Sequence, residues 1–151
     1  MATMKASTTI DRPLSAVFAY VDDWSNAAAF TQDLLSWEPL SEQTKGVGSR
    51  FKARMKVGPT TQETSLEITR WEQDAAIGWE PRGGLNQQGL YLFADHDGAT
   101  EVTLTVELTL PGGIAGRLLG KTIEPFARLN VAATMSNLKR VLESPAAPAV
   151  R

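Results

Sequence analysis

The clearest pattern in the chain is the strict alternation of apolar and polar residues over residues 100–110, which predicts a strand with one buried face. The strand follows Asp97-Gly98, a residue pair that favours a two-residue hairpin turn. Closing the hairpin there predicts the inner-face pairs Phe93–Val102, Tyr91–Leu104 and Gly89–Val106. The same register turns Leu90 and Leu92 outward, where they form either a small patch for self-association or, with a bulge, part of the inner face.

Two further turns are predicted upstream of this hairpin. A turn centred on Pro59-Thr60 would bring opposite charges together on the outer face and apolar residues together on the inner face. The expected pairs are Lys56–Glu63, Lys52–Glu67, Ala53–Leu66 and Phe51–Ile68. A turn near Gln73-Asp74 would place Trp79 opposite Ile68 and Ile77 opposite Arg70, with Trp79 facing inward and Trp71 outward.

Helical spacing appears at both ends of the chain. After a short strand over residues 5–10, Asp11 is the expected cap of a first helix, with Pro13 in its first turn. Asp23 or Ser25 is expected to cap a second short helix that runs to about Asp33. A long helix, kinked at Pro125, follows Gly112-Gly113. Its predicted inner face contains Leu118, Leu119, Ile123, Phe126, Leu129, Asn130, Ala133, Asn137 and Val141.

Composition narrows the function classes. Fifteen Lys and Arg against seventeen Asp and Glu give a formal charge of −2, which argues against a nucleic-acid partner. The absence of cysteine excludes disulfides and thiolate chemistry, and no apolar run approaches the length of a membrane span. The only histidine, His96, sits at the expected hairpin tip, where we interpret it as part of a solvated turn rather than a metal ligand. We expect no metal and no cofactor, and the lack of export signals makes the cytoplasm the expected location.

The order of elements resembles the polyketide cyclase/dehydrase-like branch of the START-like SRPBCC superfamily, over about residues 5–143. The segments that carry the resemblance are Ile10-Asp11-Arg12-Pro13, Asp22-Asp23-Trp24, residues 46–51, Ile77-Gly78-Trp79-Glu80, residues 97–103, residues 110–113 and residues 137–143. The resemblance implies an α+β helix-grip fold: a curved antiparallel sheet of six or seven strands wraps a long C-terminal helix, and two short helices follow the first strand. We expect one domain over residues 1–144 and a disordered tail over residues 145–151.

The resemblance implies a cavity between the sheet and the long helix, because similar proteins bind lipids, polyketides or other hydrophobic molecules and a minority catalyse cyclisation or dehydration. The residues expected to contact a ligand are Phe51, Met55, Leu66, Ile68, Trp79, Tyr91, Phe93, Leu104, Val106, Phe126, Asn130 and Asn137. For each apolar residue the alternative is simple core filling. For Asn130 and Asn137 the alternative is a hydrogen bond to sheet backbone or a neighbouring helix.

Three functions stay open at this point. The favoured one is binding or carriage of a hydrophobic small molecule. The second is a cyclase or dehydratase acting in the same cavity, which is weakened because no inward-facing carboxylate or histidine pair is apparent. The third is an interaction module with a closed interior that associates through Leu90 and Leu92, with a homodimer as one form of that association.

Overall fold

The computed structural model describes residues 2–109 and 113–144, and within the last helix it does not describe the side chains of residues 114–120 and 122. The expected tail at residues 145–151 and the predicted inward orientation of Leu118 and Leu119 therefore lie outside the described part. The elements are β1 (Ala2–Ile10), α1 (Leu14–Asp22), a 3-10 turn η1 (Trp24–Asn26), α2 (Ala27–Phe30), β2 (Leu34–Pro39), β3 (Arg50–Val57), β4 (Thr60–Glu72), β5 (Ala76–Gly84), β6 (Gln87–His96), β7 (Ala99–Leu108) and α3 (Gly113–Glu143).

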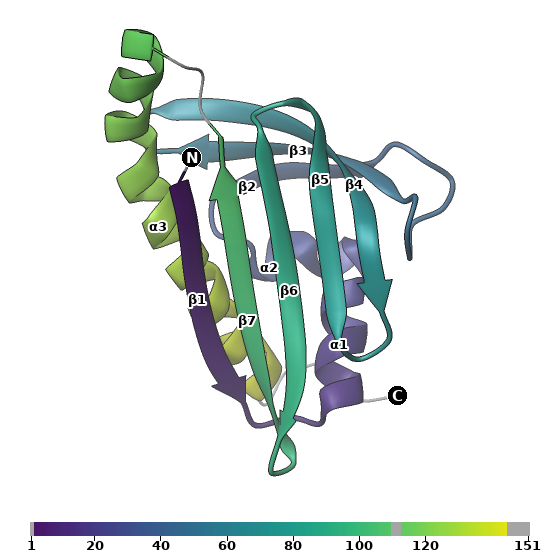
Figure 1. Ribbon diagram of the computed structural model, residues 1–151. Coiled ribbons are helices and arrows are strands. Elements are labelled where there is room, and N and C mark those ends of the chain that lie inside the picture. Colours follow the sequence, from purple (N-terminus) through teal and green to yellow (C-terminus); the bar gives the residue numbers. More distant parts are fainter. Residues whose placement is uncertain (1, 110–112, 145–151) are drawn as a thin grey trace.

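The seven strands form one antiparallel sheet in the order β1-β7-β6-β5-β4-β3-β2. The sheet curls so that β2, β3 and the start of β4 pass over the same side on which α1, α2 and α3 lie (Figure 1). This is the helix-grip fold expected from the sequence. The curvature matters because it leaves a hollow between the sheet and the helices.

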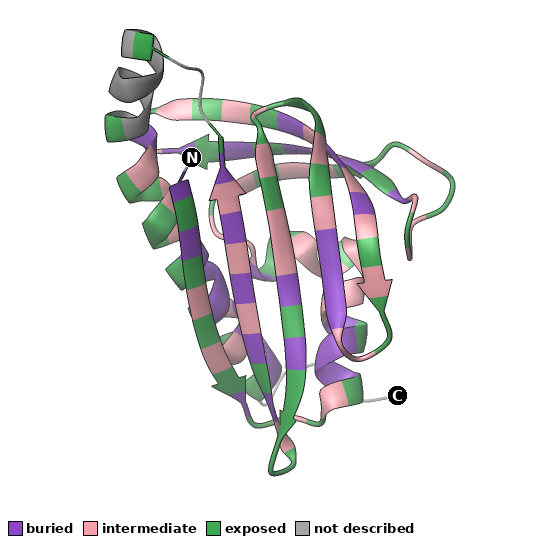
Figure 2. Cartoon of the chain, viewed as in Figure 1, coloured by how far each residue is buried: buried purple, intermediate pink, exposed green. Residues whose placement is uncertain are grey.

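The β6–β7 hairpin has the predicted register. Phe93 pairs with Val102 and Tyr91 with Leu104, around a turn in which Asp97 and Gly98 both adopt positive φ. Burial alternates along β7, as the sequence pattern requires (Figure 2). No bulge intervenes, so Leu92 faces outward and is 40% exposed.

The β3–β4 hairpin corrects the sequence prediction by two residues. Val57 pairs with Thr60, so the turn consists of Gly58-Pro59, with Gly58 at a φ of +59°. A shift of two residues preserves side-chain parity. The inner face is therefore as predicted, but the predicted pairs are wrong: the observed neighbours are Phe51–Leu66, Ala53–Thr64, Arg50–Glu67 and Arg54–Glu63.

A bulge in β4 corrects the prediction for the two tryptophans. Trp79 pairs with Ile68 as expected, but one residue of β5 then spans two of β4, so Ile77 pairs with Trp71 rather than with Arg70. The extra residue reverses the alternation beyond the bulge. Trp71 and Trp79 consequently face the same, concave side of the sheet.

The N-terminal elements also differ in detail from the prediction. Pro13, rather than Asp11, occupies the N-cap position of α1, and no side chain caps that helix. Asp23 does cap η1, accepting a hydrogen bond from the Ser25 N–H, but α2 ends at Phe30 and not near Asp33. The sequence analysis did not identify the edge strand β2, which follows directly.

The buried face of α3 lies one residue beyond the predicted one. The prediction placed Phe126, Asn130, Ala133 and Asn137 on the inner face, whereas the residues facing the core there are Ala127, Val131, Thr134, Leu138 and Leu142. Ile123 and Val141, which were also predicted to face inward, do pack against the core. One residue corresponds to a rotation of about 100° around the helix axis. Phe126 is consequently 45% exposed and Leu129 68% exposed.

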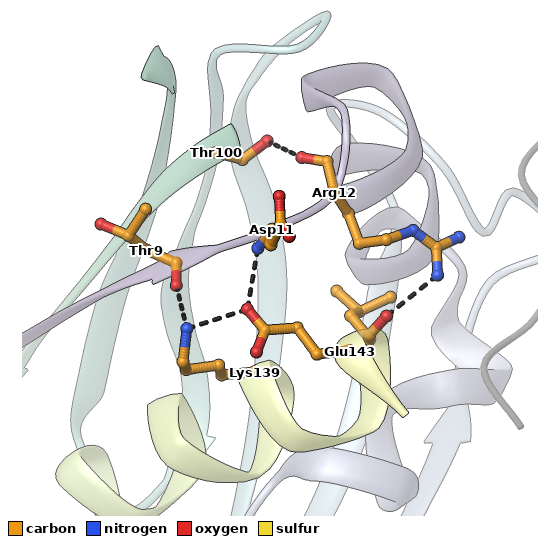
Figure 3. A network of polar contacts seen from close by, with 7 residues as sticks. Thr9, Asp11, Arg12, Thr100, Lys139 and Glu143 are labelled. Atoms are coloured by element: carbon orange, nitrogen blue, oxygen red, sulfur yellow. Dashed lines mark hydrogen bonds and ion pairs between the residues drawn. The ribbon is translucent and has the colours of Figure 1, made fainter. Parts of the chain in front are cut away.

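Polar contacts fasten the C-terminal end of α3 to the segment between β1 and α1. The Glu143 carboxylate accepts hydrogen bonds from the Asp11 N–H and from Lys139 Nζ, both at 2.8 Å. Arg12 Nη1 donates to the Leu142 carbonyl at 2.9 Å, which satisfies one of the unpaired carbonyls at the helix end. Figure 3 shows the whole network, which includes Thr9, Asp11, Arg12, Thr100, Lys139 and Glu143.

Candidate functional site

A cavity of about 140 Å³ lies between the concave face of the sheet and the helices. The sheet supplies its floor from β3 to β7, α3 supplies one wall through Asn130, Val131 and Thr134, and the α1–β2 segment supplies another. The β2–β3 loop reaches its rim through residues 44–46. The hollow exists because the sheet is strongly curved while α3 crosses only part of it (Figure 1).

Nine of the twelve residues expected to contact a ligand line this cavity. They are Phe51, Met55, Leu66, Ile68, Trp79, Tyr91, Leu104, Val106 and Asn130. Phe93 is buried elsewhere: its ring packs edge-on against Phe18 of α1, with centroids 5.1 Å apart. Phe126 lies over Gly58 at the β3–β4 turn, because the rotation of α3 turns it away from the interior. Asn137 packs beside the end of α2 and is likewise off the cavity wall.

Aromatic rings dominate the cavity wall. Seven described aromatic side chains line it: Trp24, Phe30, Trp37, Phe51, Trp71, Trp79 and Tyr91. All four tryptophans of the chain are among them. The sequence analysis missed Trp24, Phe30 and Trp37 as wall residues, since they come from η1, α2 and the unpredicted strand β2. The sequence signal for this region is Asp22-Asp23-Trp24, which supports the family resemblance but does not by itself indicate a site.

The Tyr91 hydroxyl is a hydrogen-bonding group that faces the open space of the cavity. Tyr91 is 8% exposed, and its hydroxyl makes no hydrogen bond to any described residue. The Tyr91 side chain lines the cavity. Burial raises the pKa of Tyr91. The phenol therefore stays neutral and offers one donor and one acceptor to a bound molecule.

The indole N–H groups on the wall fall into two kinds. In the described part of the chain, Trp37 Nε1 and Trp79 Nε1 are enclosed without a partner, an arrangement that costs about 1–3 kcal/mol for each group. Trp71 Nε1 instead donates to Asp22 Oδ1 at 2.9 Å. The contact joins the end of α1 to the bulged part of β4.

Asp22 corrects the expectation that no carboxylate faces the interior. It is the last residue of α1, half-buried, and it lines the cavity beside Trp71. The Trp71 N–H occupies one carboxylate oxygen and orients the group. Lys45, an exposed residue of the β2–β3 loop, brings a positive charge to the same cavity. The site thus combines an apolar, aromatic interior with charged groups on its border.

The two asparagines of α3 bind the backbone at the end of α2. Asn130 Nδ2 donates to the Gln32 carbonyl at 2.5 Å, and Asn137 Nδ2 donates to the Phe30 carbonyl at 3.2 Å. Carbonyls that follow a helix end lack intrahelical partners, and these amides satisfy them. This is the neighbouring-helix alternative considered for both residues. Asn130 nevertheless also borders the cavity.

In the described part of the chain, no three His, Asp or Glu side chains gather closely enough to hold a metal ion. Among the same residues, no helix has both the length and the apolar character needed to cross a bilayer. His96 is exposed at the tip of the β6–β7 hairpin, away from the cavity.

Comparisons with known proteins agree with this architecture. The sequence profile of the family described as "Polyketide cyclase / dehydrase and lipid transport" matches residues 1–143. No curated protein matches the sequence significantly.

Solved structures resemble the chain across nearly its whole length. A protein of Thermus thermophilus superposes with a TM-score of 0.80 at 19% identity, covering 92% of this chain and 95% of its own. The Zhui aromatase/cyclase of a Streptomyces species gives 0.74 at 13% identity, with 97% and 99% covered. The Aha1 dimer of Colwellia psychrerythraea gives 0.63 at 12% identity, with 95% and 97% covered. At these identities the likeness shows the fold.

Proposed function

The chain belongs to the polyketide cyclase/dehydrase and lipid transport family, and from this premise we propose that it binds or carries a hydrophobic small molecule in its internal cavity. The single observation that carries the proposal is the hollow of about 140 Å³ beneath α3, lined mainly by apolar and aromatic side chains. An apolar pocket with a few polar groups is the usual form of a small-molecule site.

Two features of the cavity support binding over simple core filling. A core packed to normal density leaves few voids larger than a water molecule, and each void forfeits dispersion contacts. The Tyr91 hydroxyl on its wall also has no hydrogen-bond partner among the described residues. A ligand would recover both losses, because it fills the void and bonds the hydroxyl.

A cavity-filling substitution tests the proposal. Ala53 is buried on β3 and lines the cavity, whereas Ala94 is exposed on β6. We expect Ala53→Phe to abolish quenching of the intrinsic tryptophan fluorescence by small aromatic compounds, and Ala94→Phe to leave it intact. Native mass spectrometry of the wild-type protein would identify any compound that co-purifies. Equal quenching in both folded variants would contradict a ligand site in this cavity.

Asp22 favours a second candidate, a cyclase or dehydratase acting in the same cavity. A carboxylate beside an apolar cavity can remove a proton next to a ligand carbonyl, while a neutral phenol such as Tyr91 hydrogen-bonds the carbonyl oxygen. The named aromatase/cyclase among the structural neighbours is consistent with such chemistry. Asp22 does not need a metal for this role.

A matched pair of variants separates the enzyme from the carrier. Asp22→Asn keeps the shape and a hydrogen-bond acceptor for Trp71 but loses the base, and Asp23→Asn changes a neighbour that caps η1 instead. If the protein is an enzyme, Asp22→Asn should lower turnover of a poly-β-ketone substrate by about 10²-fold or more with unchanged binding. Equal turnover in both variants would exclude Asp22 as the base.

Location and assembly remain predictions. A cytoplasmic location is the sequence-based expectation. Homodimer formation through Leu90 and Leu92 also stays a prediction, and sedimentation of the wild type against Leu92→Lys would test it.

A further inference from the structure

A second, smaller hollow of about 30 Å³ adjoins the main cavity under α3. The two share five residues: Met55, Gln87, Val106, Asn130 and Val131. We call the larger one the aromatic chamber and the smaller one the side chamber. The shared side chains form the boundary between the chambers, and one of them is Met55, whose unbranched side chain adapts readily.

The chemistry of the walls differs between the chambers. The residues that border only the side chamber are aliphatic: Met4, Val57, Leu85, Leu108, Ile123 and Ala127. None of its described lining residues carries an aromatic ring, in contrast to the seven rings of the aromatic chamber. A planar ring therefore matches one chamber, and a saturated chain matches the other.

Two side-chain amides stand at the junction of the chambers. The Gln87 side chain has no hydrogen-bond partner among the described residues, and Gln87 borders both chambers. Asn130 borders both as well, and only one of its amide hydrogens is taken by the Gln32 carbonyl. The residues at the junction therefore have N–H donors that no described residue accepts from, which favours a ligand with an acceptor oxygen between its ring and its aliphatic chain.

The volumes limit the size of each ligand part. An engineered cavity of about 150 Å³ holds one benzene, whereas sites for drug-sized ligands occupy about 300–1,000 Å³. The aromatic chamber, at about 140 Å³, thus has room for one ring enclosed by its walls. The side chamber has room for about two or three carbon groups, since one water needs about 10–15 Å³.

We propose that the ligand class is a single-ring aromatic compound that carries a carbonyl-type oxygen and a short aliphatic chain, of which alkyl phenyl ketones are the simplest examples. The inference rests on the proposed ligand-binding function and narrows it. The ring occupies the aromatic chamber, the oxygen accepts from Gln87 at the junction, and the chain enters the side chamber.

A homologous series of alkyl phenyl ketones tests this assignment on the wild-type protein. Acetophenone, propiophenone, butyrophenone, valerophenone and hexanophenone differ by one methylene each. Binding is read from quenching of the four cavity tryptophans, corrected for ligand absorbance with N-acetyltryptophanamide. We expect the Kd to fall about fourfold per added methylene as far as butyrophenone, and then to stop falling because the side chamber is full.

Two pairs of variants test where the aliphatic chain and the carbonyl oxygen of the ligand lie. Ala127→Leu fills the side chamber, and Ala132→Leu makes the same change at an exposed position of α3. Only Ala127→Leu should remove the gain from acetophenone to butyrophenone. Gln87→Leu should weaken butyrophenone by between about twofold and about tenfold, the contribution of one hydrogen bond, and leave butylbenzene unchanged. Gln88→Leu, on the outer face of β6, should change neither.

The outcomes separate this inference from the proposed function. If acetophenone binds in the cavity but the Kd falls steadily through hexanophenone, or butyrophenone binds no better than butylbenzene, the inference is wrong and the proposed function stands. If neither the ketones nor the alkylbenzenes quench the wild type and Ala53→Phe differently, both are wrong. The wild-type series decides the matter even if Ala127→Leu fails to fold.

Discussion

Gly89 permits the most direct test of how the sheet supports the cavity. It lies on the inner face of β6, and its backbone needs no glycine, since its φ is not in the left-handed region. Glycine in a strand is normally about 0.5–1 kcal/mol less stable than alanine, so Gly89→Ala would be expected to stabilise the protein. The structure predicts the opposite, for a steric reason.

The Trp79 indole lies directly over Gly89. A Cβ added there would stand 2.1 Å from Cζ2 and 2.6 Å from Cε2 of Trp79. Such distances force the whole ring to move, and overpacking of this kind typically costs about 1–3 kcal/mol. We therefore expect Gly89→Ala to lower the free energy of unfolding by about 1 kcal/mol, and by at most about 2.5 kcal/mol, after the alanine gain is subtracted.

A double-mutant cycle with Trp79→Leu isolates the cause. The smaller side chain removes the ring from the space above Gly89, so Gly89→Ala should then be neutral or stabilising. Urea unfolding followed by circular dichroism would measure each free energy, and the expected coupling is about 1–3 kcal/mol. Gly78→Ala on the neighbouring strand is the control. There the new Cβ would lie 3.2 Å from Leu90 Cδ1 and 3.3 Å from Arg70 Cβ, contacts that shifts of a few tenths of an ångström relieve. If Gly89→Ala has the same effect with and without Trp79, the indole does not fill that space.

Three further predictions concern the ends and borders of the fold. Hydrogen bonds from Lys139 and then from the Asp11 backbone lower the pKa of Glu143 from 4.5, so the ionised carboxylate stabilises the fold above that pH and this stabilisation is lost as the pH falls through the folded pKa. Urea unfolding at a series of pH values between about 7 and 3 should show a fall in the free energy of unfolding in the acid range, and Glu143→Gln should show a smaller fall. Identical pH profiles for the two proteins would contradict this role of Glu143. Gly84→Ala should lower the melting temperature measured by calorimetry, because Gly84 has a φ of +76° and its added Cβ would lie 2.1 Å from the Glu63 carbonyl oxygen; an unchanged melting temperature would refute this. Trp71→Phe removes the donor to Asp22 and should cost about 1–2 kcal/mol in urea unfolding, a loss that Asp22→Asn should reduce when the two are combined.

Elements with strong local signals could be predicted from the amino-acid sequence without knowledge of the fold. The Asp97-Gly98 turn and the strict alternation after it fixed the β6–β7 register, because a two-residue turn leaves one way to pair its flanking strands. Parity alone put Phe51, Met55, Leu66 and Ile68 on the inner face. That assignment survived a two-residue register error at Gly58-Pro59, since side chains repeat with a period of two.

Other features follow from contacts between distant segments, because the local sequence is compatible with more than one arrangement. The bulge in β4 brings Trp71 to the same side as Trp79, and nothing in the alternation announces it. On α3, two apolar stripes lie one residue apart, and packing against the sheet selected the stripe of Val131, Leu138 and Leu142 over that of Phe126. Contacts between distant segments make that choice, because burial of a helix face depends on what covers it and not on its periodicity.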